Sequence, residues 1–131
     1  HDVVQTMERQ GAKLADAFNR VSRDKGLQDF VAARGRPSCL IFTTNDHDGH
    51  PSQAFRTLFM QELLARGVLG QSLVISAAHT DEDIAQTVDA VSGALDVYGL
   101  AIADRSTDRW LRGRPVAPAL REFAAPRRLV P

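Results

Sequence analysis

Four residues that can bind a metal ion, Asp46, His47, Asp48 and His50, stand within one short stretch of the chain. Carboxylate and imidazole groups are common metal ligands, so this stretch is a candidate metal site. The same stretch also contains Gly49 and the residue types that form turns, in which aspartate hydrogen-bonds its own backbone. No second group of ligands stands elsewhere at a spacing known for zinc sites. We therefore expect a solvated turn here and no metal site.

A second candidate is His79, which is followed by Thr80 and then by Asp83. Imidazole titrates near neutral pH and can serve as a catalytic acid or base. No serine or cysteine nucleophile motif accompanies it, however. Thr80 and Asp83 have the spacing of a capping box, with aspartate in place of the usual glutamate or glutamine. We expect these three residues to shape the start of a helix, and we predict no catalytic residue in the chain.

The chain has two lysines, Lys13 and Lys25. A lysine that forms a Schiff base needs an apolar pocket or a cationic neighbour that activates its amine. Lys13 lies off the apolar face of a predicted helix, and Lys25 lies at the end of that helix. Neither is expected to act as a nucleophile.

Helical periodicity of apolar residues predicts three helices. The first spans residues 3–24 and is followed by Gly26. The second spans residues 52–66, between the N-cap Ser52 and Gly67. The third begins after Thr80 and continues through Tyr98. The expected buried positions of the second helix are Phe55, Leu58, Phe59, Leu63 and Leu64.

Three short apolar runs between these helices, at residues 27–33, 38–44 and 73–77, predict strands. Arg34-Gly35-Arg36-Pro37 separates the first two, which indicates a turn or a bulge. The order is therefore helix, strand, strand, helix, strand, helix. We predict an α+β fold with a small, mostly antiparallel sheet of about three strands and helices packed on one face.

Charge is unevenly distributed although the formal net charge is zero. Residues 1–103 hold 13 acidic against 9 basic side chains, and residues 104–131 hold 3 acidic against 7 arginines. The second stretch is also rich in proline, so we expect one domain over 1–103 and an Arg/Pro-rich extension over 104–131. The overall neutrality disfavours nucleic acid as a partner, and no apolar run is long enough to predict a membrane span. A single cysteine, Cys39, is expected in a buried strand, and its lack of a partner fits a cytoplasmic protein.

Two stretches carry a likeness to a known family. Residues 55–69 form a helix that leads into Gly67-Val68, and residues 74–84 hold Ser76-Ala77-Ala78-His79-Thr80 immediately before the next helix. Together they resemble the C-terminal small domain of class III pyridoxal-phosphate-dependent aminotransferases, near the glutamate-1-semialdehyde aminomutase branch. The likeness covers about residues 3–103.

The resemblance implies a parent enzyme that binds pyridoxal phosphate through a large domain, which supplies the Schiff-base lysine, and that works as a dimer. The small domain would then form one wall of the active site, with Arg36, Gln71 and Ser76 as candidates for the substrate side. We expect the present chain to be inactive alone and to bind no cofactor. It starts without Met and inside a predicted helix, which is why we expect a piece of a longer protein.

The likeness to the family is incomplete, and one alternative stays open. The segment between Gly67-Val68 and Ser76 is shorter than in the aminomutases, which carry an acidic residue there, and Gln71 is the nearest polar residue in this chain. The substrate, and the choice between transfer and mutase chemistry, are therefore not predicted. The alternative is a free-standing α+β ligand-binding or regulatory module, since small sheets of this kind serve many functions.

Overall fold

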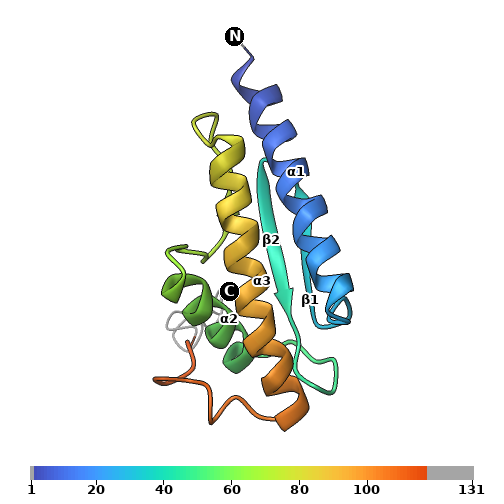
Figure 1. The fold of residues 1–131 in the computed structure, drawn as a ribbon, viewed down its shortest axis with the longest axis vertical. Helices are drawn as coiled ribbons and strands as arrows, with labels where there is room; N and C mark the ends of the chain where they lie inside the picture. Colours follow the sequence, from blue (N-terminus) through green and yellow to red (C-terminus); the bar gives the residue numbers. More distant parts are fainter. Residues whose placement is uncertain (1, 118–131) are drawn as a thin grey trace, which may run out of the picture.

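The computed structural model describes residues 2–117. Its elements are α1 (Val3–Asp24), β1 (Val31–Arg36), β2 (Cys39–Thr44), α2 (Gln53–Ala65), β3 (Leu73–Val74) and α3 (Asp81–Asp104), shown in Figure 1. The strands form one antiparallel sheet in the order β1-β2-β3. The predicted α+β fold is confirmed.

The helices begin and end at the residues that the sequence marks. Asp2 caps α1 by accepting a hydrogen bond from the Gln5 backbone N, and Ser52 caps α2 in the same way through Phe55 N. Gly26 and Gly67 follow the ends of α1 and α2 with φ of 70° and 84°. Glycine adopts these left-handed backbone angles without strain because it has no Cβ.

The first strand lies later in the chain than predicted, at Val31–Arg36 instead of 27–33. The reason is a turn after α1, in which the Leu27 carbonyl accepts hydrogen bonds from the backbone N of Phe30 and of Val31, both at 2.9 Å. Leu27 is buried as part of the core and not as part of a strand. The predicted interruption of strand pairing at Gly35 does not occur. Gly35 has a φ of 96° and still pairs with Leu40 of β2.

The third strand is shorter than predicted, since only Leu73 and Val74 pair with β2. Ile75 N still donates to Ser38 O at 3.4 Å, but a turn then closes from Ser76 O to His79 N at 3.2 Å. The chain thus leaves the sheet to start α3.

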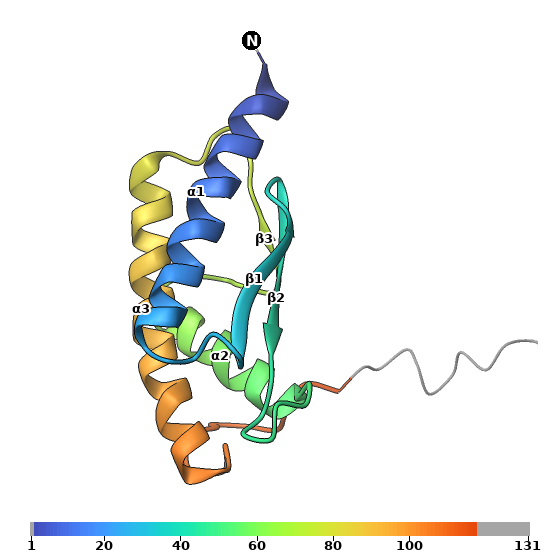
Figure 2. The same ribbon diagram turned by 90° about the vertical axis from the view of Figure 1, so that its right-hand side faces the viewer.

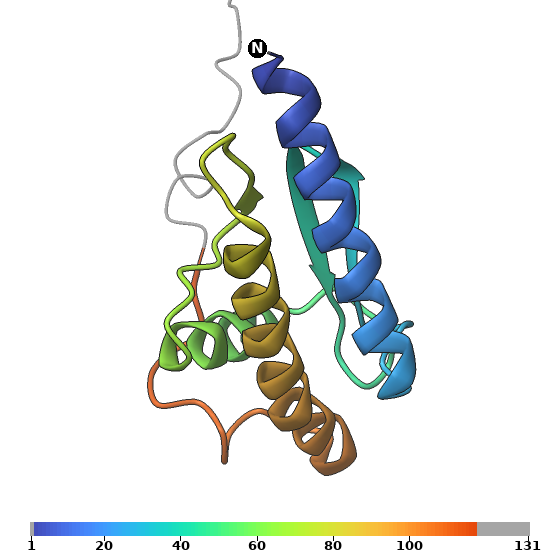
Figure 3. The same ribbon diagram turned by 45° about the horizontal axis from the view of Figure 1, so that its top comes forward.

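α1 and α3 lie side by side on one face of the sheet, as Figure 2 shows. α2 lies beside α3, on the side away from α1, and contacts α3 and β2 (Figure 3). The core between these layers contains an aromatic cluster from all three helices and β2, made of Phe18, Phe42, Phe55, Phe59 and Tyr98. Burial raises the pKa of Tyr98, whose hydroxyl donates to the Asn45 carbonyl.

Two predictions of burial were wrong. Leu64 is 60% exposed, because it lies on the side of α2 that faces away from α3 and β2. Cys39 is exposed, because side chains alternate along β2 and it is Leu40 and Phe42 that enter the core. Among residues 2–117, no helix has the length and apolar character needed to cross a membrane.

Candidate functional site

The corner between β3 and α3 is the most polar organised part of the described chain. Thr80 Oγ1 accepts from the Asp83 backbone N at 3.2 Å, and the Asp83 carboxylate accepts from the Thr80 backbone N at 2.7 Å. This reciprocal pair is a capping box, which satisfies two donors at the helix start. His79 Nδ1 accepts from the Ser76 backbone N at 2.9 Å and lies 3.1 Å from Ser76 Oγ. The geometry gives His79 a structural part in the turn.

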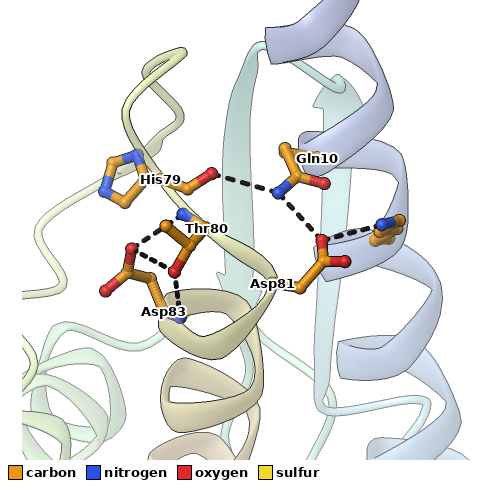
Figure 4. A network of polar contacts seen from close by, with 6 residues as sticks. Gln10, His79, Thr80, Asp81 and Asp83 are labelled. Atoms are coloured by element: carbon orange, nitrogen blue, oxygen red, sulfur yellow. Dashed lines mark hydrogen bonds and ion pairs between the residues drawn. The ribbon is translucent and has the colours of Figure 1, made fainter.

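Gln10 ties this corner to α1, as Figure 4 shows. Its Nε2 donates to the His79 carbonyl and to the Asp81 carboxylate, each at 3.0 Å, and only 5% of the residue is exposed. Lys13 Nζ binds the same Asp81 carboxylate at 2.8 Å. The sequence held a signal for Gln10, because it lies three residues after Met7 and four before Leu14, on the apolar side of the helix. A polar residue at such a position needs a buried partner.

Hydrogen bonds lower the pKa of two carboxyl groups at this corner. The Lys13 ammonium and then the Gln10 amide hold the pKa of Asp81 below its usual range. The backbone N–H and then the hydroxyl of Thr80 do the same for the pKa of Asp83. Both groups are thereby kept ionised, which suits the positive end of the α3 dipole and does not suit proton transfer near neutral pH.

Arg36 lies at the end of β1, beside the turn to β2. Its Nε donates to the Glu8 carboxylate at 2.8 Å, and Ser38 Oγ donates to the same carboxylate at 2.8 Å. These bonds, first that of Ser38 and then that of Arg36, lower the pKa of Glu8. The Arg36 side chain is 74% exposed, so its outer nitrogens face solvent.

Gln71 lies in the segment between α2 and β3. Its carbonyl accepts a hydrogen bond from Arg56 Nη2 at 2.8 Å, and the Arg56 guanidinium stacks on the Phe42 ring with its carbon 4.7 Å from the ring centroid. Gln71 also lines a surface groove beside α2.

The three substrate-side candidates do not meet at one point. Ser76 and Arg36 are both near the turn between β1 and β2, because Ile75 pairs with Ser38. Gln71 lies toward the other end of β3, against α2. The described residues therefore offer two separate polar positions, one near the turn between β1 and β2 and one against α2.

The face of the sheet opposite α1 and α3 carries exposed apolar side chains, and no described helix covers it (Figure 2). Ile41 and Val74 are 57% and 56% exposed, and Cys39 lies between them by register. We call Cys39, Ile41 and Val74 the open face. The alternation of side chains along β2 decides which of its residues face outward.

The turn at Asp46–His50 binds its own backbone. The Asp46 carboxylate accepts from the backbone N of His50 at 3.0 Å and of Asp48 at 2.9 Å, and these bonds, that of His50 first, lower the pKa of Asp46. Within the described part of the chain, no group of three or more His, Cys, Asp or Glu residues is arranged to hold a metal ion.

Lys13 on α1 and Lys25, which caps the end of α1, form ion pairs with Asp81 and with Asp96, respectively. Neither lines a described cavity, and neither meets the requirement of an apolar setting for Schiff-base formation. The described residues therefore do not fit pyridoxal phosphate as a covalent cofactor of this chain itself.

A comparison with known proteins tests the resemblance to the aminotransferases. The chain is 31% identical over 104 residues to the glutamate-1-semialdehyde 2,1-aminomutase of Clostridium novyi (strain NT). The resemblance to the aminomutases is confirmed. The alignment covers 72% of the chain but 24% of the aminomutase, so the chain spans about a quarter of the length of this relative. No family model matches the chain.

Replacing Thr80 with alanine is expected to reduce the free energy of unfolding by about 1 kcal/mol, the usual effect of removing an N-cap side chain. The reason is the loss of the acceptor for Asp83 N. Urea denaturation followed by circular dichroism measures it. Thr87→Ala is the matched control, because Thr87 lies inside α3 and alanine is the better helix former there. Equal denaturation midpoints for the two variants would contradict the observed cap.

Acid is expected to destabilise the domain only below about pH 4, near the pKa of an ordinary unfolded carboxyl group. The folded-state pKa values of Glu8, Asp46, Asp81 and Asp83 are all lowered. Their contribution is therefore complete above the unfolded pKa and is lost as the pH falls through the folded pKa. Urea midpoints measured from neutral pH downward test this. Asp81→Asn should be less stable at neutral pH and should lose less stability in acid, and an unchanged acid response would refute the assignment for Asp81.

Proposed function

We propose that this chain is the C-terminal small domain of a pyridoxal-phosphate-dependent aminotransferase similar to the glutamate-1-semialdehyde aminomutases. The domain comprises residues 1–103, and residues 104–131 are an Arg/Pro-rich extension. The identity of 31% over 104 residues to an aminomutase about four times longer than the matched segment carries the proposal. The parent chain then supplies a large cofactor-binding domain as the partner of this one, and we propose that the parent is a cytoplasmic homo-oligomer.

The open face is the surface proposed to contact the remainder of the parent. Ile41 and Val74 expose more than half of their surface next to Cys39, and contiguous exposed apolar side chains mark interaction sites. The same sheet is covered on its other face by α1 and α3. A further domain against the open face would give the sheet the two covered faces that are common in multi-layer proteins.

In the parent, pyridoxal phosphate supplies the electron sink for chemistry at the substrate amine. The residues of this chain are proposed to bind and orient, and not to carry out the chemistry. The contact with Glu8 engages the Nε of Arg36, and a guanidinium has five N–H donors, so the outer nitrogens can bind a substrate carboxylate. Gln71 and Ser76 are proposed as neutral hydrogen-bonding groups on the same wall.

Two observations, one on the 131-residue chain and one on its gene, test this proposal. Titration with pyridoxal phosphate should give no saturable absorbance change and no borohydride-trapped adduct at Lys13 or Lys25. A specific adduct at either lysine would refute the proposal that another domain of the parent supplies the Schiff-base lysine. The coding sequence upstream of residue 1 should encode a domain with a Schiff-base lysine, and a start codon directly before residue 1 would favour the free-standing module instead.

Association through the open face gives a third test. The isolated chain should self-associate because Ile41 and Val74 are exposed, and sedimentation over a dilution series should show it. Ile41→Glu should shift the chain to a monomer. Leu100→Glu is the matched control, since Leu100 is 51% exposed but lies on α3. A strict monomer before any substitution would contradict the assignment of this face as an interface.

A further inference from the structure

β2 is paired along its whole length on one side only. Toward β1 all six of its residues pair, whereas toward β3 only Cys39 and Leu40 do. β3 therefore lies beside one end of β2, and the other end continues past it toward the start of α2 (Figure 2). The unpaired side of β2 covers residues 41–44 and ends at the bridge between Asn45 and Pro51.

The backbone groups of Phe42 and Thr44 point to this unpaired side. Successive residues of an antiparallel strand point their N–H and C=O alternately to its two neighbours. Asn45 N donates to Phe30 O on the β1 side, and Thr44 O accepts from Ser52 N on the opposite side. By the same alternation, the Phe42 N–H and C=O and the Thr44 N–H also point away from β1, where no backbone group of the described residues bonds them. Such an edge can pair with one more strand.

A cavity of about 240 Å³ lies along this edge, lined by Phe42, Thr44 and Ser52 among others. Arg56 of α2 also lines it, and its Nη2 donates to the carbonyl of Gln71, which precedes β3 by two residues. The arginine therefore lies at the end of the cavity nearest to β3. The unpaired stretch of four residues is about 13 Å long and has room for about two or three residues of an extended peptide.

Arg56 is held in place but has no carboxylate partner in the described part of the chain. Its guanidinium carbon lies 4.7 Å from the centroid of the Phe42 ring, and one hydrogen bond fixes it to Gln71. None of the ion pairs among residues 2–117 includes it. A guanidinium has five N–H donors in a planar fork that matches a carboxylate. Arg56 therefore has donors left for an anionic ligand at the end of the cavity.

We propose that the unpaired edge of β2 binds the C-terminal end of an extended peptide, which adds as an antiparallel strand and places its terminal carboxylate on Arg56. β3 runs antiparallel to β2, and a peptide in the same orientation passes Thr44 first and Phe42 last. Its C-terminus thus arrives where Arg56 lies. The main-chain hydrogen bonds of the added strand supply affinity, and the carboxylate contact selects a chain end. None of the three substrate-side candidates lines this cavity, so the site does not depend on the proposed aminotransferase function.

Titration of the full 131-residue chain with the N-acetylated tetrapeptide Ala-Val-Thr-Val tests the carboxylate contact, with the C-terminal amide of the same peptide as the comparison. The acid should bind about tenfold more tightly than the amide, because its bond to the arginine is charge-assisted. Arg56→Gln should remove this difference, and Arg56→Lys should keep part of it. Arg34→Gln is the matched control, because Arg34 is exposed on β1, and it should leave the binding of both peptides unchanged.

Hydrogen exchange of single amides, measured by NMR, tests the added strand itself. The acid peptide at saturation should slow exchange of the Phe42 and Thr44 N–H about tenfold or more. The Ala33 N–H, which already donates to Asn19, is the internal reference and should not change. Absence of binding, or unchanged exchange at both amides, would overturn the proposal. Equal binding of acid and amide, or acetate that binds as tightly as the tetrapeptide, would overturn it as well, since the site would then not recognise a peptide C-terminus.

Discussion

Gly11→Ala is expected to destabilise the domain by about 2–3 kcal/mol, in the upper part of the range for overpacked cores. A Cβ at Gly11 would lie 1.7 Å from the Pro37 carbonyl oxygen and 2.3 Å from its carbon. Both are backbone atoms of the turn between β1 and β2, so neither can move aside as a flexible side chain could. The turn or α1 must shift, and the contact between Glu8 and Ser38 nearby would be disturbed with it.

Gly99→Ala provides the matched control for this prediction. Gly99 is also inside a helix, but a Cβ there would meet only Leu27 Cδ1 at 3.8 Å, an ordinary contact. Alanine at such a position stabilises a helix by about 0.5–1 kcal/mol. Urea denaturation midpoints should therefore move in opposite directions for the two variants. If both variants are stabilised, α1 does not approach the turn as closely as the structure shows.

Gly11 illustrates what the sequence could predict. Its spacing from Met7 and Leu14 places it on the buried face of α1, and that expectation agrees with its burial. The partner of that face is the turn at Pro37, and no local pattern in residues 3–24 specifies it. Periodicity reports which side of a helix is buried, but not against what.

The errors in the sheet have a related cause. Leu27 and Val31 are both buried, so a run of apolar residues could not distinguish a turn packed on the core from the strand that follows it. Cys39 was expected to be buried because its neighbours are apolar, but Leu40 and Phe42 fix the inward parity of β2. A shift of β2 by one residue would turn Leu40 and Phe42 outward and Cys39 and Ile41 into the core.

The candidate site was predictable only in part. The capping box at Thr80 and Asp83 follows from four adjacent positions, and local rules of this kind are readable from sequence. The link from Gln10 to Asp81 joins residues 71 positions apart. The contact of Arg36 with Glu8 likewise depends on how α1 crosses the turn between β1 and β2. Such pairings are set by the tertiary fold.

Phe59→Ala is expected to have the largest effect of any substitution considered, a loss of about 3–5 kcal/mol. Phe59 is fully buried, and its ring centroid lies 5.1 Å from that of Phe42, 5.9 Å from that of Phe18 and 6.4 Å from that of Tyr98. It therefore joins α1, β2 and α3 through a residue of α2. Removing the ring both loses its transfer free energy and leaves a cavity that three separate elements would have to close.

A domain of this size has a total stability of about 5–15 kcal/mol, so this loss would leave a large unfolded population at elevated temperature. Thermal and urea unfolding should both show it. Val4→Ala is the control, since Val4 is apolar but 58% exposed on α1, and it should change stability by less than about 0.5 kcal/mol. A loss below about 1 kcal/mol for Phe59→Ala would mean that the cluster collapses around the missing ring. The three helices would then be held to the sheet mainly by the aliphatic contacts of Leu14, Leu58 and Leu95 and not by the aromatic cluster.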